Sequence, residues 1–242
     1  MKRILAIVLT LTLLIAGCAL AEDVPNYAIG FAEANLSNEA NSVFIEAAQN
    51  YCASMTDRKI ELHVIDANGN GADQVAAMET FISEGVDCVI VNPCDAAACQ
   101  VGVEMCIEAG VKVIVAKTTI EDQSIATYVG QDDVIAGEIE MQWIVDQLGG
   151  AGNIVIIEGP TGNSAAINRN DGIHNVLANY PDINVLYSQP GNWKREEGMS
   201  LMETWLQTNS DIGAVVAHND EMALGAYDAI VDAGKNGQIL VI

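Results

Sequence analysis

Short apolar runs alternate with amphipathic segments from Tyr27 to the end of the chain. Runs such as Val89–Val91 and Ile154–Ile157 are almost purely Val and Ile, which indicates strands buried on both faces of a parallel sheet. The strands are expected at Tyr27–Ala32, Ile60–Asp66, Cys88–Val91, Val111–Ala116, Ile154–Glu158, Asn184–Ser188, Ala214–Ala217 and Ile239–Ile242.

The segments between these runs have apolar residues at helical spacing. Several are followed directly by a glycine, as at Gly85 and Gly149, which suits the left-handed position after a helix. The helices are expected at Asn41–Met55, Ala72–Glu84, Ala96–Ala109, Val134–Leu148, Ala165–Asn179, Glu196–Thr208 and Glu221–Ala233. Strict alternation of strands and helices predicts a doubly wound α/β fold.

One polar stretch, Thr118 to Gln131, interrupts the alternation around a short apolar run at Ala126–Val129. We place a crossover between two α/β lobes near its end. The predicted lobes cover residues 22–128 and 129–242, and the second is expected to be incomplete within this sequence.

The N-terminus has the pattern of an export signal over residues 1–21. Two basic residues precede the apolar run Ile4–Ala16, which is too short for a bilayer span of ~20 residues. Two processing sites compete: a lipobox ending at Cys18, which would carry a lipid anchor, and an A-x-A site at Ala19–Ala21. The protein is therefore predicted to act outside the cytoplasm, in the periplasm or at the cell surface, as a secreted or lipid-anchored form.

The net charge of the chain restricts both the class of function and the kind of ligand. The chain has 33 acidic and 10 basic residues, a net charge of −23. Nucleic-acid binding needs a basic surface, so this class is excluded. The acidic balance favours solubility and a neutral or cationic ligand.

Five cysteines follow Cys18, and an odd number does not describe a closed disulfide framework. We expect free thiols buried as small hydrophobic groups, with a Cys94–Cys99 disulfide as the alternative. A zinc site is not expected, since no CxxC pair or nearby histidine supplies the ligand spacing.

Polar loops follow the predicted strands at their carboxyl ends, where open α/β sheets bind ligands. Their Asn, Ser, Thr and acidic residues suit a hydroxylated ligand, although such residues also cap helices. These loops are Glu33–Glu39, Asn92–Asp95, Lys117–Thr119, Gly159–Ser164 and His218–Asp220.

The segment His218–Gly225 reads HNDEMALG and is similar to a signature of the ribose-binding-type (type I) periplasmic sugar-binding proteins. Val86–Pro93, Ala109–Ile114 and Gly162–Ala166 support this resemblance, which extends from about Tyr27 to Ile242. It implies two Rossmann-like lobes with parallel sheets, a ligand cleft between them, closure on binding, and delivery of the ligand to the membrane permease of an ABC importer.

The resemblance also implies site residues. Asn38, Arg169 and Asn219 match positions that bind sugar hydroxyls, and Trp193 matches an aromatic residue that stacks on the sugar. The chemistry agrees, because arginine offers a rigid fork of donors and asparagine both donates and accepts. Lys117 stands where the family often has an acidic residue or asparagine beside an arginine, and we expect it to contact the ligand from the first lobe.

Other departures from the family leave the ligand open. Ala40 and Asn41 replace aromatic residues, so one stacking wall is missing, and Phe44 compensates only in part. Ile239–Ile242 resembles the strand before a further ligand loop, so we expect the chain to stop short of the family's usual end. The predicted ligand is a sugar, a polyol or an inositol-like molecule, and a modified sugar or a weakly anionic ligand fits as well.

Other function classes fit less well. A ligand receptor for a sensor kinase or chemoreceptor on the same fold is the main alternative. A repressor would need a helix-turn-helix and a basic surface. No nucleophile elbow, P-loop, HExxH or GxGxxG pattern is present, and His63, His174 and His218 are scattered. We therefore expect a monomeric binding protein that needs no cofactor or metal and is not an enzyme.

Overall fold

The computed structural model describes residues 24–208 and 211–242. The predicted signal segment and Cys18 lie outside the described residues. Among the described helices, none combines the length and apolar character that crossing a membrane would require.

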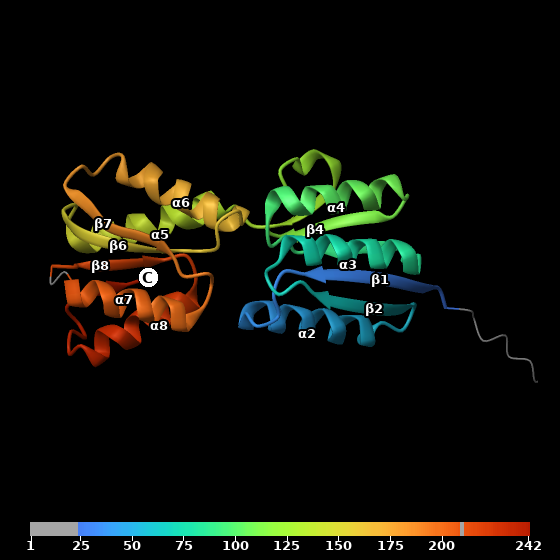
Figure 1. The fold of residues 1–242 in the computed structure, drawn as a ribbon, viewed down its shortest axis with the longest axis horizontal. Coiled ribbons are helices and arrows are strands. Elements are labelled where there is room, and N and C mark those ends of the chain that lie inside the picture. The colour runs from blue at the N-terminus through green and yellow to red at the C-terminus, as the bar shows by residue number, and fades with distance from the viewer. Residues whose placement is uncertain (1–23, 209–210) are drawn as a thin grey trace, which may run out of the picture.

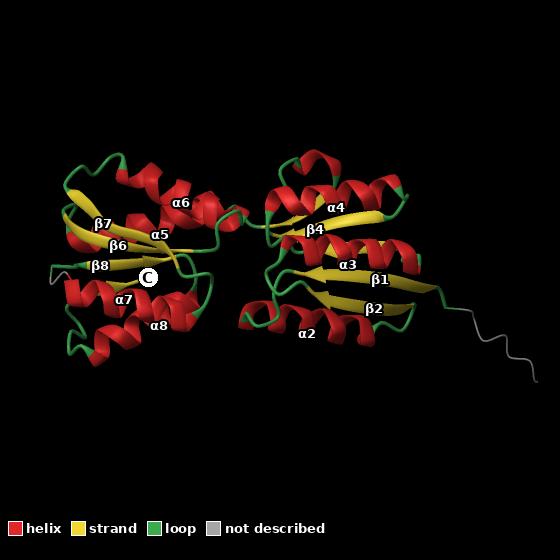
Figure 2. Ribbon diagram, viewed as in Figure 1, coloured by secondary structure: helices red, strands yellow, loops and turns green. Residues whose placement is uncertain are grey.

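The first lobe is built on a parallel sheet with strand order β2-β1-β3-β4-β5 (Figure 1). Its helices lie on both faces of the sheet (Figure 2). The strands are β1 (Asn26–Glu33), β2 (Lys59–Asp66), β3 (Cys88–Val91), β4 (Lys112–Lys117) and β5 (Thr127–Gly130), and the helices are α2 (Glu39–Ser54), α3 (Gly71–Glu84) and α4 (Ala96–Glu108), with a 3-10 turn η1 (Gln123–Ile125).

The second lobe repeats this plan with strand order β7-β6-β8-β9, again parallel. Together the two sheets confirm the predicted α/β fold class with parallel sheets. The strands are β6 (Gly152–Glu158), β7 (Ile183–Pro190), β8 (Ala214–Ala217) and β9 (Leu240–Val241), and the helices are α5 (Asp133–Leu148), α6 (Ser164–Leu177), α7 (Arg195–Thr208) and α8 (Asp220–Asp232).

The central strand β6 explains why a Val/Ile run forms here. Ile154 and Ile156 pack into a core with α5 and α6, while Val155 and Ile157 pack on the other face with α7 and α8. All four side chains are fully buried, because successive side chains of a strand point to opposite faces of the sheet. In the first lobe, Val89 and Val91 of β3 pack with α3 and α4 in the same way.

The backbone at the helix ends agrees with the sequence. Gly85, Gly110, Gly149 and Gly234 all have positive φ after their helices, as predicted. The short apolar run Ala126–Val129, for which no strand was predicted, forms β5, which pairs with β4 as far as Gly130. Val129 and Gly130, which the sequence assigned to the second lobe, therefore belong to the first sheet.

The carboxyl ends of both sheets face each other. In Figure 1 the arrowheads of β1 and β8 point toward the opposite lobe. The chain passes once from the first sheet to α5, through Gln131 and Asp132. This orientation places the loops after the strands of both lobes along one boundary.

Candidate functional site

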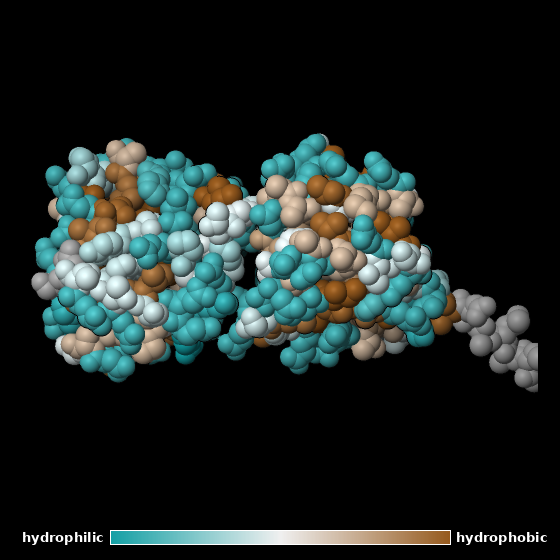
Figure 3. Space-filling model, in the orientation of Figure 1, coloured by the Kyte–Doolittle hydropathy of each residue, from teal (hydrophilic) through white to brown (hydrophobic). Residues whose placement is uncertain are grey.

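The two lobes meet along one rim and leave a groove between them. The N–H of Ala96 donates to the carbonyl of Gly162 at 3.1 Å, and the N–H of Thr119 donates to Oγ of Ser164 at 2.7 Å. Figure 3 shows a narrow groove between the lobes. The loops that flank it are those that the sequence analysis selected as ligand loops.

Lys117 ends β4 in an unusual backbone conformation. Its φ is 65°, and the N–H of Thr118 reaches back to the carbonyl of Ala116 at 2.8 Å, so the chain makes a tight three-residue turn. A positive φ at a residue other than glycine is costly and concentrates at functional sites. The turn aims the ammonium group of Lys117 at the first turn of α2.

The Lys117 ammonium group is held on two sides. It donates to Oδ1 of Asn41 and lies 5.6 Å from the centre of the Phe44 ring, a distance at which a cation is attracted to the ring face. Burial lowers the pKa of Lys117; the carboxyl of Glu33 opposes this shift, and the charge of Arg169 adds to it. An ammonium group has three N–H donors, and among the described residues only Asn41 accepts one of them.

Beneath Lys117 lies a buried polar network that the sequence analysis did not assign. Asn92 donates from Nδ2 to Oε1 of Glu33 at 2.6 Å and to Oδ1 of Asn41 at 3.4 Å. Oδ1 of Asn92 accepts from the Thr118 hydroxyl at 3.1 Å. Burial raises the pKa of Glu33 to about 6, although Asn92 and Lys117 partly offset it.

Arg169, on α6, is the corresponding cation of the second lobe. Its Nε donates to Oδ1 of Asp133 at 3.0 Å, and the two side chains are 18% and 4% exposed. Its Nη1 donates to the carbonyl of His218, and its guanidinium carbon lies 5.7 Å from the centre of the Trp193 ring. Two of its five N–H donors are thus occupied among the described residues, which leaves donors for a ligand.

Trp193 also has a positive φ, 65°. Its ring fits over Gly159, where a Cβ would collide with the indole. Asn219 fixes this loop, since its Nδ2 donates to the Trp193 carbonyl at 3.2 Å. Its Oδ1 accepts from the N–H of Met222 at 3.0 Å and so caps α8.

His218 lies between these groups and is fully buried. The N–H of Gly159 donates to its Nδ1 at 3.2 Å, which places the ring proton on Nε2. Burial first, and the charge of Arg169 second, lower the pKa of His218 to about 3. The imidazole is therefore neutral at physiological pH and serves to pack beside Trp193, whose ring centre is 6.4 Å away.

Asn38 is the predicted site residue with the plainest structural role. It caps α2, and its Oδ1 accepts from the N–H of Asn41 at 3.3 Å. Its half-buried side chain lies at the groove end of the helix that carries Asn41 and Phe44. A contact between Asn38 and a ligand stays a prediction.

The five predicted residues thus fall into one region. Arg169, Trp193 and Asn219 are joined by direct contacts, and the charge of Arg169 acts on Lys117 across the groove. Three buried supports were not predicted as site residues: Asp133, and also Glu33 and Asn92, which only began two of the predicted ligand loops. Glu33 gave one signal, an acidic residue at the end of the apolar strand Tyr27–Ala32.

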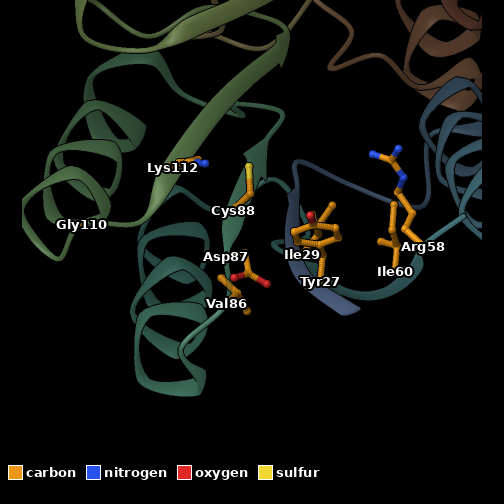
Figure 4. Close-up of a pocket in the computed structure, with 9 residues that line it drawn as sticks. All are labelled: Tyr27, Ile29, Arg58, Ile60, Val86, Asp87, Cys88, Gly110 and Lys112. Atoms are coloured by element: carbon orange, nitrogen blue, oxygen red, sulfur yellow. The ribbon is translucent and has the colours of Figure 1, made fainter. Parts of the chain in front are cut away.

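Other features lie apart from this region. All five described cysteines are free thiols, and Cys94, Cys99 and Cys106 are buried as predicted. A hollow of about 550 Å³ includes Tyr27, Arg58 and Lys112 (Figure 4). It lies at the amino ends of the strands in the first sheet, opposite the groove, where α/β sheets do not usually bind ligands.

Comparison with known proteins agrees with the fold described above. A family model described as a periplasmic binding protein domain matches residues 29–242. A solved structure of an ABC transporter solute binding protein from Bacillus halodurans, with bound myo-inositol, has a TM-score of 0.81 and 33% identity, and the match covers 91% of this chain and 76% of that one.

Two relatives are similar over most of this chain. A xylitol-binding protein of Mycolicibacterium smegmatis is 42% identical over 183 residues, which is 75% of this chain and 52% of that protein. A ribose import binding protein of Bacillus subtilis is 32% identical over 253 residues, covering 100% of this chain and 81% of that protein. The chain thus matches about half the length of the xylitol-binding protein.

Proposed function

The chain belongs to the periplasmic binding protein domain family, and from this premise we propose that it is a solute-binding protein that captures a sugar, polyol or inositol-like molecule between its lobes. In this proposal it delivers the ligand to the permease of an ABC importer. The observation that carries it is the position of Lys117 at the carboxyl end of β4, where the charge of Arg169 from the other lobe acts on it, while Arg169 lies over the Trp193 ring.

The proposed mechanism follows from what each lobe offers. Lys117 donates to ligand oxygens from the first lobe. Arg169 donates from the second, while Trp193 covers an apolar C–H face of the ligand. Because only a ligand held by both lobes makes all these contacts, binding shifts the lobes toward a closed arrangement. Asn38 and Asn219 add amide groups at the two helix ends that face the groove.

The proposal also covers where the protein acts, in what form, and what happens to its ligand. We propose that the protein acts outside the cytoplasm, as a monomer, either soluble or anchored through Cys18. It releases its ligand chemically unchanged and binds no nucleic acid. Recovery of an altered ligand after prolonged incubation would contradict the non-enzymatic assignment.

A thermal-shift titration of the purified protein with xylitol, D-ribose and myo-inositol tests the function. A ligand at 100 times its Kd should stabilise the protein by about 2.7 kcal/mol. The Trp193→Ala variant should lose most of that shift. A folded protein that shifts with none of the three, or a variant that shifts as the wild type does, would contradict the proposal.

A further inference from the structure

Glu33 is an acidic residue in a place where a charge is costly. It ends β1 and is 0% exposed. Its Oε1 accepts from Nδ2 of Asn92 and from the N–H of Ala34, both within 2.8 Å. Its Oε2 is buried and has no hydrogen-bond partner among the described residues. A buried carboxylate with one oxygen unpaired loses hydration that the protein does not fully replace, so its presence calls for a compensating role.

The network around Glu33 leads to Lys117. From Oε1 of Glu33 the chain of hydrogen bonds runs through the amide of Asn92 to Oδ1 of Asn41, and from there to the ammonium group of Lys117. The carboxylate and the ammonium group are therefore linked through two side-chain amides, and each favours the charged form of the other. Glu33 itself is too buried to touch a ligand in the groove.

Lys117 also faces a second cation. The charge of Arg169, from the other lobe, disfavours the charged form of Lys117. Asp133 neutralises Arg169 within the second lobe, so the first lobe needs a matching negative charge if both cations are to approach one ligand. Among the described residues, Glu33 is the carboxyl group that acts on Lys117.

We propose that Glu33 is the buried counter-charge of Lys117, and that its ionisation permits the two lobes to close with Lys117 and Arg169 facing the same ligand. This inference rests on the proposed function and adds a positioning residue to it. It also defines the ligand, which should turn acceptor oxygens toward both cations, as a neutral polyol does, without bringing a net charge.

Among the described residues, no other carboxyl group near Glu33 could take this role. On β2 the register partner Asp66 is occupied by the N–H groups of Leu36 and Asn68. The side chains that act on Glu33 are Asn92, which follows β3, and Lys117 of β4.

The direction of the pH effect follows from the pKa of Glu33, raised to about 6. Below that pH, Glu33 is neutral and Lys117 meets Arg169 without compensation, so ligand affinity should fall as the pH falls through 6. The free energy of unfolding of the ligand-free protein should change in the opposite direction with pH. A raised carboxyl pKa means that folding favours the protonated form, so the ionised group makes the fold less stable as the pH rises through this window.

The first test needs no ligand. The acetylation rate of Lys117, followed by peptide mass spectrometry between pH 7 and 11, gives its apparent pKa, with exposed Lys112 as the internal reference. In Glu33→Gln the apparent pKa of Lys117 should fall while that of Lys112 stays the same. An unchanged Lys117 pKa in the folded variant would overturn the inference even if the proposed function holds.

The second test measures Kd for xylitol, D-ribose or myo-inositol, whichever binds, between pH 5 and 7.5. Wild-type affinity should fall about tenfold toward pH 5, the size expected for one partly screened charge pair. Glu33→Gln should bind about tenfold more weakly at pH 7.5 and should lose the fall in affinity that is centred near pH 6. Its free form should nevertheless melt at a higher temperature at pH 7.5, which a merely structural role would not produce.

Glu140 of α5 must be separated from this effect, because burial raises its pKa to about 7 and the charge of Arg169 acts on it. The pH series is therefore repeated in the Glu140→Gln background, where the fall in affinity centred near pH 6 should persist because Glu33 is intact. The matched control is Glu61→Gln, an exposed carboxyl that pairs with Lys59, and it should leave the pH profile of ligand affinity unchanged. A fall that disappears in Glu140→Gln, or one that persists when Glu33→Gln is added to that background, would contradict the inference. Absence of any ligand binding would count against the proposed function alone, since the acetylation test stands by itself.

Discussion

A single guanidinium group organises the second half of the site at the residue scale. Arg169 pairs with Asp133, donates to the His218 carbonyl and lies over the Trp193 ring. An arginine can do this because its planar fork has donors in several fixed directions, whereas lysine has one compact charge. The Arg169–Asp133 pair is also mostly buried, so removing one partner would leave an uncompensated charge.

Arg169→Lys should therefore weaken ligand binding by at least about tenfold, because the ammonium group can keep Asp133 but cannot also reach the ligand. Calorimetric titration measures this change. The control is Arg195→Lys, an exposed arginine that pairs with Glu221 at 3.0 Å. Equal losses in the two variants would mean that Arg169 has no special place in the site.

The sequence predicted the groove-facing residues better than their supports. Arg169, Trp193 and Asn219 were selected through motif resemblance, and the structure brings them into contact. Asp133 was not selected, and Glu33 was selected only as the start of a ligand loop, because the role of both comes from burial, and burial depends on which strands and helices meet. The positive φ of Lys117 likewise has no signal in a sequence without glycine at that position.

At the scale of elements, close helix packing fixes the position of Arg169. Gly137 of α5 faces the backbone of α6, and a Cβ there would collide with the Arg169 carbonyl oxygen. Gly172 lets α6 approach α5 from the other side, against the carbonyl of Val134. Helices that approach this closely cannot separate without moving the residues they carry.

Gly137→Ala should lower the stability of the fold by ~1–3 kcal/mol, since the clash is with rigid backbone, and should weaken ligand binding by displacing Arg169. Denaturant unfolding and ligand titration measure the two effects. Gly102→Ala is the control, because there the new Cβ meets only the flexible end of Met78 in the first lobe. Identical effects in both variants would argue that α5–α6 packing does not position the site.

The elements themselves were largely visible in the sequence. Buried Val/Ile runs and helical periodicity predicted most strands and helices to within about two residues. β5 was harder, since its burial is low and only its pairing with β4 defines it. Its apolar run, Ala126–Val129, is short and lies within a polar stretch, so periodicity gave little indication that the first sheet extends to Gly130.

At the scale of the whole molecule, one chain crossing couples the two halves of the site. The Tyr128 hydroxyl lies 2.9 and 3.0 Å from the carbonyl oxygens of Lys117 and Gln131, and these two acceptors share its single proton. Gln131 in turn donates to Oδ1 of Asp133 at 3.1 Å, the atom that binds Arg169. A continuous set of contacts therefore runs from the residue that carries the first-lobe cation to the second-lobe cation.

The central claim is that one ligand bridges both lobes, and hydrogen–deuterium exchange with and without the ligand found in the thermal-shift panel tests it most directly. The account predicts slower exchange on both sides of the groove, including the Ala96 and Thr119 amides that bond to the second lobe and the residues that follow β6 and β8. Slowing confined to one lobe, or centred on the hollow beside Tyr27 and Arg58, would contradict it.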